Sequence, residues 1–286
     1  MVFDSESAFE NALIAKLSTS YGWSDKILRY KTEKDLIQNW ADILFNNNRE
    51  IDRLGEYPLT ESEMAQIIEQ VNSLRTPVSL NTFINGKTIS IKRDNPDDKE
   101  HFGKEVSLKI YDRKEIAGGK SCYQIAEQPI FNSSNPVARN GRGDFMLLIN
   151  GMPVIHVELK KSDVPVIQAC EQIKRYAHEG FFSQGIFSLI QVFVAMNPEE
   201  ALYFANPGQD SNFKKEYYFH WADFNNEPIN YWANVAETLL SIPMAHKLIG
   251  FYTIADNTDN VLKVMRSYQY FATENIIKKV AMIQWD

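Results

Sequence analysis

The stretch from Asp144 to Lys160 constrains the fold of this chain more than any other. It reads DFMLLIN-GMP-VIHVELK, in which an acidic residue opens an apolar run, a short turn follows, and a second apolar run ends in Glu-Leu-Lys. Both runs are rich in Ile, Val, Leu and Phe, which favour strands, and Asn150-Gly151 between them is typical of a tight hairpin turn. The stretch therefore predicts a β-hairpin.

The register of this hairpin decides whether its two acids meet. If the loop consists of residues 150–152, Ile149 faces Pro153. Asp144 then stands opposite Glu158, and cross-strand partners share a face with Cβ atoms about 5 Å apart. A two-residue loop alone would turn Glu158 to the other face of the sheet. Convergence of the acids therefore requires an odd-length loop or a β-bulge.

Two converging carboxylates suit Mg²⁺, a hard cation that takes one or two carboxylates and keeps several waters for substrate phosphates. Lys160 follows Glu158 by two residues and so shares its face of the strand. A lysine in that place can orient or deprotonate an attacking water and offset charge on a phosphate. The alternative is a solvent-facing hairpin with an ordinary surface Glu/Lys pair.

Asp144…Glu158-Leu159-Lys160 resembles the site motif of the PD-(D/E)xK nucleases. Residues 166–180 read as a helix that ends at Gly180, and Gln172 and Tyr176 lie four apart on one face of it. A glutamine and a tyrosine on the helix after Glu-x-Lys make the Gln-x-x-x-Tyr signature of one branch of these nucleases. Alone they would be an ordinary helix surface pair, but joined to the hairpin they favour the nuclease interpretation.

Charge sets a limit on any nucleic-acid surface. The net charge of −7 argues against an extensive one, although it permits a local patch. Lys160, Lys161, Lys174 and Arg175 form a basic cluster around the candidate site, and phosphate contact needs only such a patch. The alternative is solvated charge on a helix and a strand end.

No apolar run approaches a membrane span and the N-terminus has no signal-peptide features, so we expect a cytoplasmic protein with no membrane partner.

The rest of the chain predicts an α/β fold, a mixed central sheet flanked by helices. Strand–helix–strand order after the hairpin requires such a mixed sheet. His156 shares the face of Glu158 but has no second histidine at metal-ligand spacing, so it is interpreted as structural. The predicted helices are 4–18, 32–47, 60–71 with a Thr60/Glu63 capping box, and the region from Asn230. The predicted strands are 81–93 with a turn at Asn85-Gly86, 106–112, 122–131, the central 186–197, 200–206 and 216–223, while 92–105 and 255–261 are predicted to be polar connections.

Taken together, these stretches resemble the N-terminal part of the restriction (motor) subunit of type I restriction enzymes. The residues that carry this likeness are the hairpin motif, Gln172–Tyr176, Tyr203–Asn206 and the tail Arg266–Gln269. The resemblance implies a nuclease domain over 1–254, with a helical elaboration at about 19–75. It also implies that 255–286 is a linker and the start of a truncated superfamily 2 helicase domain, whose remaining ATPase parts lie outside this chain.

The resemblance also implies roles for residues. Asp144 and Glu158 would hold Mg²⁺, with Mn²⁺ as a substitute, Lys160 would act on the water, and Gln172 and Tyr176 would steady the site. An N-terminal helix commonly lends a further glutamate in this family, so Glu10 is a candidate and Glu6 a lesser one; the alternative is a solvated helix glutamate. Lys161, Lys174 and Arg175 would contact DNA. Gln269 would read the adenine of ATP, a cofactor of the full-length subunit only.

The whole subunit would cleave double-stranded DNA after ATP-driven translocation, in a complex with modification and specificity subunits. One departure is Gly143, which stands where the family usually has proline before the aspartate; glycine permits φ values that other residues avoid. Two alternatives remain open: a non-catalytic DNA-binding or docking module with a nuclease-like fold, and a stand-alone repair or homing-type nuclease. The helicase-like tail argues against the second alternative.

Overall fold

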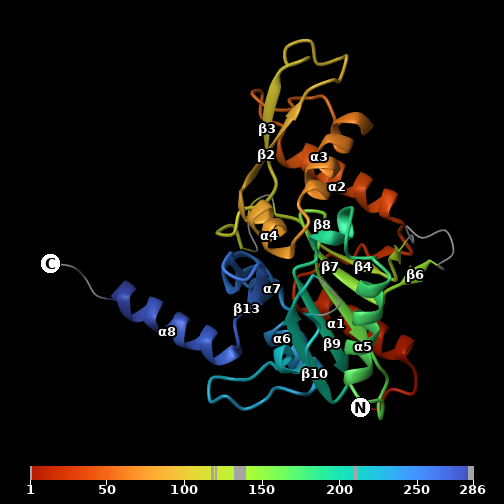
Figure 1. Ribbon diagram of the computed structural model, residues 1–286, viewed down its shortest axis with the longest axis vertical. Helices are drawn as coiled ribbons and strands as arrows, with labels where there is room; N and C mark the ends of the chain where they lie inside the picture. The colour runs from red at the N-terminus through yellow and green to blue at the C-terminus, as the bar shows by residue number, and fades with distance from the viewer. Residues whose placement is uncertain (1, 117–118, 120, 132–139, 209–211, 283–286) are drawn as a thin grey trace.

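A computed structural model describes residues 2–116, 119, 121–131, 140–208 and 212–282. Its centre is a mixed sheet that has seven strands in the described residues (Figure 1). In spatial order they are β1 (Leu28–Arg29), β4 (Tyr123–Glu127), β7 (Phe145–Ile149), β8 (Met152–Leu159), β9 (Val192–Asn197), β10 (Glu200–Ala205) and β11 (Phe219–His220). Strands β8 and β9 run parallel, whereas β8 and β7 are antiparallel.

Helices flank this sheet, as the α/β prediction required. Strands β7, β8 and β9 are buried along their whole length, because their continuous apolar runs are covered on both faces. Two helices, α1 and α5, pack against β8. The α-helices are α1 (Glu6–Ser20), α2 (Glu33–Asn47), α3 (Glu61–Ser73), α4 (Pro77–Asn85), α5 (Ile167–His178), α6 (Trp232–Thr238), α7 (Ile242–Lys247) and α8 (Ser267–Met282). None of the described helices is long and apolar enough to cross a membrane.

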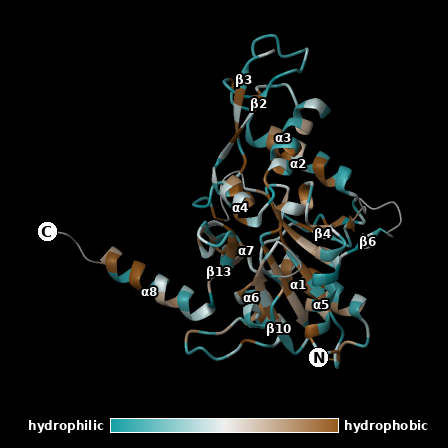
Figure 2. Ribbon diagram, viewed as in Figure 1, coloured by the Kyte–Doolittle hydropathy of each residue, from teal (hydrophilic) through white to brown (hydrophobic). Residues whose placement is uncertain are grey.

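Smaller elements surround the sheet. The paired short strands are β2 (Thr88–Lys92) with β3 (Glu105–Lys109), β5 (Ile130–Phe131) with β6 (Gly141–Arg142), and β12 (Thr253–Asp256) with β13 (Val261–Val264). Single helical turns are η1 (Ile186–Leu189), η3 (Lys215–Tyr217) and the π-helical η4 (Leu248–Tyr252). Helix α8 extends away from the rest of the molecule, and its last turns carry exposed apolar residues (Figures 1 and 2).

Two of the predicted strands are wrong over part of their length, and local helix signals explain the first. Residues 81–85 belong to α4, where Thr76 caps the helix and Pro77 occupies its first position, so Asn85-Gly86 ends a helix and makes no hairpin turn. The predicted strand 216–223 shrinks to η3 followed by β11.

Two further expectations are wrong at the ends of strands. The predicted central strand 186–197 begins with the helical turn η1, so that only β9 joins the sheet. The predicted linker 255–261 forms part of the β12–β13 hairpin, in which Ala255 pairs with Leu262 and Asn260 has a φ of 56°. Asparagine tolerates this left-handed conformation, so a polar segment can close a tight turn.

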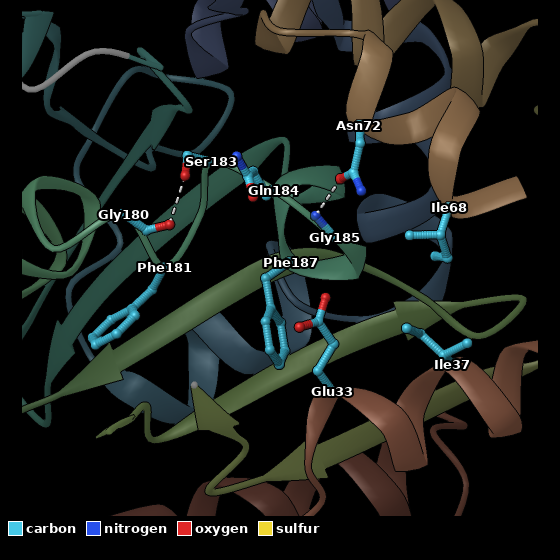
Figure 3. A pocket seen from close by; sticks show the side chains of 10 residues that line it. All are labelled: Glu33, Ile37, Ile68, Asn72, Gly180, Phe181, Ser183, Gln184, Gly185 and Phe187. Atoms are coloured by element: carbon cyan, nitrogen blue, oxygen red, sulfur yellow. Dashed lines mark hydrogen bonds between the residues drawn. The ribbon is translucent and has the colours of Figure 1, made fainter. Parts of the chain in front are cut away.

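The segment between α5 and β9 is anchored from the helical side of the molecule. The Glu33 carboxylate accepts the Ile186 N–H at 3.0 Å. The Asn72 side-chain oxygen accepts the Gly185 N–H at 2.7 Å, a hydrogen bond that Figure 3 shows. Gly185 has a φ of 62°, and a Cβ there would collide with the Glu33 carboxylate. Glu33, Asn72 and Gly185 line a cavity of about 420 Å³ between α2, α3 and the segment. Helices α2 and α3 therefore fix the path of the chain that leaves α5.

A buried ion-pair network holds the β2–β3 hairpin against α3. The Arg93 guanidinium donates to Glu63 at 2.8 Å and to Asp98 at 2.9 Å, and all three side chains are at most 1% exposed. Burial alone would raise the pKa of Asp98, but hydrogen bonds from Arg93 and the His101 backbone lower it. Glu63 also closes the predicted capping box with Thr60 at the start of α3. One arginine thus joins a helix cap to the hairpin.

We predict that Arg93→Ala lowers the free energy of unfolding by about 3–5 kcal/mol, because it leaves two buried carboxyls without their counter-charge. Urea denaturation measures the loss. Lys92→Ala is the matched control, since Lys92 is exposed at the neighbouring position and its removal should change stability by less than about 0.5 kcal/mol. Equal effects of the two substitutions would contradict the prediction.

Candidate active site

The β7–β8 hairpin brings the two acids together by means of a bulge. Ile149 pairs with Met152, so the turn is the two-residue Asn150-Gly151, and of the two alternatives, an odd-length loop or a bulge, the chain has the bulge. The register then shifts: Leu148 faces Pro153 but Leu147 faces Ile155, which leaves an extra residue at 154. A two-residue turn alone would place Glu158 on the opposite face of the sheet from Asp144. The extra residue of the bulge returns it to the same face.

Asp144 precedes β7 at the point where Phe145 pairs with Val157, and so it faces Glu158. A backbone group of β8 holds the Asp144 side chain beside Glu158, because Asp144 Oδ2 accepts the Leu159 N–H at 2.6 Å. Glu158 is fully buried, whereas Asp144 is half-buried. Two carboxyls from neighbouring strands therefore lie side by side at one end of the hairpin.

Lys160 lies beside these acids and is held from three sides. Its Nζ donates to the Leu159 carbonyl at 2.8 Å and to Gln172 Oε1 at 2.9 Å. The same ammonium group forms an ion pair with Glu6 of α1 at 3.2 Å, and only 9% of the lysine side chain is exposed. The ammonium group is thus kept close to the acids.

Helix α5 contributes the predicted glutamine and tyrosine. Gln172 Nε2 donates to the Tyr176 hydroxyl at 2.7 Å, and that hydroxyl donates to the Arg142 carbonyl at 2.8 Å. The two side chains therefore connect Lys160 to the segment that leads into Asp144. The helical spacing of four residues places both on the face that looks at β8.

Helix α1 contributes a buried glutamate. Glu10 is 3% exposed, so the alternative of a solvated helix residue is wrong. Its Oε2 accepts a hydrogen bond from Gln128 at 2.8 Å, whereas its Oε1 has no partner among the described residues. The pKa of Glu10 is raised to about 7, chiefly by burial, and the charge of Asp144 adds to the rise.

The electrostatics of the Asp144–Glu158 pair favour the binding of a positive charge. The pKa of Asp144 is raised to about 7, first by burial and then by the Glu158 carboxyl. The pKa of Glu158 is raised to about 8, because burial outweighs the opposing charge of Lys160. Glu158 Oε1 is buried and accepts no hydrogen bond in the part of the chain that is described. Carboxyls buried in this way are stabilised by a proton or by a cation.

These residues fit a magnesium ion that takes only a few of its ligands from the protein. Across the described ranges, no group of three or more His, Cys, Asp or Glu side chains is arranged to hold a metal. Mg²⁺ nevertheless needs only one or two carboxylates, with waters and substrate oxygens completing its shell. Asp144 and Glu158 supply carboxylate oxygens from neighbouring segments of the hairpin, and the carbonyl of Leu159, the residue after Glu158, is an oxygen donor of the same kind.

Basic residues predicted to contact DNA differ in their exposure. Lys161 and Arg175 are exposed, and the Arg175 guanidinium lies 5.7 Å from the centre of the Tyr176 ring. Lys174 is half-buried on the same helix. Two exposed cations therefore lie on segments that also carry site residues, Lys161 next to Lys160 and Arg175 next to Tyr176.

Gln269 lies elsewhere. Its side-chain oxygen accepts the Arg266 N–H at 2.9 Å at the start of α8. It lines a cavity of about 370 Å³ together with Phe219, Met265 and Arg266. No site residue described above lines this cavity, and the predicted role of Gln269 toward ATP stays a prediction.

The sequence did not predict that His156 contacts a residue of the site. Its Nε2 lies 3.1 Å from Glu158 Oε2, and burial lowers its pKa to about 4. The spacing of two residues on β8 was the available signal, but it could not distinguish a structural histidine from one that touches the acid. Gly143 does not adopt the positive φ that glycine permits, but a Cβ there would lie 2.5 Å from His156 Cε1, so glycine allows the imidazole to approach the backbone.

Comparison with known proteins adds an independent finding. The family model described as "Type I restriction enzyme R protein N terminus" matches residues 4–212. A "Type I restriction enzyme SauMSSORF170P endonuclease subunit" of Staphylococcus aureus is 31% identical over 283 residues, which cover 98% of this chain and 27% of that protein. The SsaAORF53P endonuclease subunit of Staphylococcus saprophyticus is 31% identical over 281 residues, 97% of this chain and 27% of that protein. The EcoprrI endonuclease subunit of Escherichia coli is 31% identical over 179 residues, 62% of this chain and 55% of that protein.

We predict that the metal-free protein loses stability as pH rises from about 6.5 to 8.5. A carboxyl whose pKa is raised by folding contributes stability that is fully present below its unfolded pKa, and this contribution is lost as pH passes the folded value. For Asp144 and Glu158 the loss begins at about pH 4, where unfolded carboxyls titrate, and ends at the folded values of about 7 and 8, so its last part lies above about pH 6.5. His156 is neutral in both states above about pH 6.5 and adds nothing there.

Thermal unfolding in the presence of EDTA measures this dependence. Glu158→Gln should flatten it and should be more stable than the wild type near pH 8.5 by at least about 1 kcal/mol, since one pKa unit corresponds to about 1.4 kcal/mol. Glu179→Gln, at an exposed position just after α5, is the control and should follow the wild type. Parallel curves for the wild type and Glu158→Gln would show that the buried carboxyl does not titrate in this range.

Proposed function

We propose, because the chain belongs to the type I restriction enzyme R protein N-terminus family, that it is the Mg²⁺-dependent endonuclease domain of a type I restriction enzyme motor subunit. The chain spans 27% of the length of the staphylococcal relatives named above. In the full subunit the domain would hydrolyse phosphodiester bonds of double-stranded DNA after ATP-driven translocation. Modification and specificity subunits would be its partners, and Gln269 would contact ATP beyond the nuclease domain.

The observation that carries the proposal is the meeting of two carboxyls, one fully buried and one half-buried, with one lysine at the end of β8. Asp144 and Glu158 would hold Mg²⁺ together with the Leu159 carbonyl. The chemistry that a bound Mg²⁺ supplies is charge stabilisation at the phosphate and activation of water. Glu158 Oε1, which is buried and has no hydrogen-bond partner among the described residues, is the oxygen that would face the cation.

Lys160 would act on the attacking water and on the phosphate charge. Its ammonium group is held by the Leu159 carbonyl and Gln172, so little reorganisation is needed when DNA arrives. Gln172 is in turn held by Tyr176, whose hydroxyl is anchored on the backbone of Arg142. These residues would keep the lysine in place while DNA occupies the site.

We predict that Asp144→Asn and Lys160→Ala each lower DNA cleavage by at least about 100-fold in the full-length subunit assembled with its partners, a loss typical of removing one preorganised charged group. ATP hydrolysis by the same complex is the control and should stay within about twofold, because neither side chain contributes to the motor. Cleavage retained by either variant would overturn the assignment. Loss of cleavage together with loss of ATP hydrolysis would indicate a defect in assembly.

Metal binding separates this proposal from a non-catalytic DNA-binding module. Calorimetry with Mn²⁺ should detect binding to the wild-type chain and none to Glu158→Gln. A chain that binds DNA without binding Mn²⁺ would favour the module.

We predict that the double variant Lys161→Ala/Arg175→Ala binds duplex DNA more weakly and lowers the slope of log affinity against log salt by about 1–2, as expected for the loss of up to two phosphate contacts. Fluorescence anisotropy at several salt concentrations measures both quantities in the assembled complex. The control is Lys99→Ala/Lys104→Ala, which removes two exposed lysines between β2 and β3. An equal loss in the control would mean that only net charge matters.

A further inference from the structure

We propose that His156 is a positioning residue, which holds one oxygen of Glu158 so that the other is presented to the cation. This inference rests on the proposed metal-dependent function. It begins from the 3.1 Å contact between His156 Nε2 and Glu158 Oε2, in which neither side chain is exposed. Both residues lie on β8, two apart, and therefore on the same face of the strand.

The direction of this hydrogen bond follows from the other nitrogen of the ring. His156 Nδ1 is buried and has no partner among the described residues. A hydrogen on Nδ1 would be a buried donor without an acceptor, and the lone pair of Nε2 would then face a carboxyl oxygen. The hydrogen therefore lies on Nε2 and is donated to Glu158 Oε2.

Aromatic rings keep the imidazole in this orientation. Phe131, Tyr176, Phe182 and Phe193 surround it, with ring centroids 5.5 to 6.3 Å from its own. Side chains packed at this density leave little room for another rotamer. The hydrogen bond is thus directed by packing as well as by its own geometry.

Gly143, in the segment that leads into β7, leaves the space that the imidazole occupies. A Cβ at position 143 would lie 2.5 Å from His156 Cε1 and 3.0 Å from Phe131 Cζ. Any side chain there would have to displace the ring. Because Gly143 directly precedes Asp144, the imidazole fills the space between the backbone of one acid and the side chain of the other.

The consequence is a carboxyl whose two oxygens differ. Oε2 of Glu158 accepts the histidine hydrogen, whereas Oε1 is buried and accepts no hydrogen bond within the described residues. With one oxygen occupied, Glu158 would ligate a cation through Oε1 alone. Hydrogen bonds to ligating side chains act in this way when they set the orientation of a ligand.

Titration calorimetry with Mn²⁺ at one fixed pH tests the inference on this chain. His156→Gln keeps an N–H near the position of Nε2 and should bind Mn²⁺ within about threefold of the wild type, whereas His156→Leu should bind at least about 10-fold more weakly. Gly143→Ala retains the histidine but displaces it, and should also weaken binding. Thermal unfolding of each variant shows whether it folds.

The outcomes are distinguishable. If the wild type binds Mn²⁺ and His156→Leu binds it equally well, His156 has no positioning role, although the proposed function stands. If His156→Gln and His156→Leu lose affinity equally, the hydrogen bond is not what matters and the inference is overturned. If the wild type itself does not bind Mn²⁺, the proposed function fails and this inference fails with it. If His156→Leu does not fold, the folded Gly143→Ala variant decides.

Discussion

The placement of two acids side by side, Glu158 fully buried and Asp144 half-buried, is the constraint on which this site depends. Asp144 and Glu158 would separate if their strands allowed it. The Leu159 N–H holds Asp144 to the opposite strand, and packing on both faces of β8 keeps the Glu158 side chain in place. Burial is the main cause of the raised pKa values of both acids, and the Glu158 carboxyl adds to the rise at Asp144. A lysine at the edge offsets the repulsion in part, and a cation would complete the balance. The surrounding helices are placed accordingly: α5 holds the lysine, and α1 supplies two further acids.

Much of this arrangement is present in short-range sequence signals. Asn150-Gly151 indicates a turn because both residues tolerate positive φ, and their φ values are 51° and 83°. The spacing of Gln172 and Tyr176 requires a common helical face, and the Thr60/Glu63 capping box marks the start of α3. The requirement for an odd loop or a bulge also followed from strand parity alone. Such features depend on neighbours within a few residues, which is why reasoning from the sequence reaches them.

The parts that could not be predicted depend on contacts between distant residues. No local pattern marks Val154 as the bulged residue, since valine suits any strand position. The burial of Glu10 follows from how α1 packs and from Gln128, far away in the chain. The role of Gly143 is visible only once the position of the His156 ring is known. The catalytic roles themselves rest on the family resemblance and on chemistry, and the geometry is compatible with them.

The bulge at position 154 limits which insertions and deletions the hairpin can accept during evolution. Because side chains alternate along a strand, the number of residues between the two acids matters only as odd or even. Gaining or losing a single residue within the hairpin would turn Glu158 away from Asp144, while a change of two, or one change matched by loss of the bulge, would preserve the meeting. Length variation in this hairpin should therefore occur in steps of two, a counting rule imposed by the pleat.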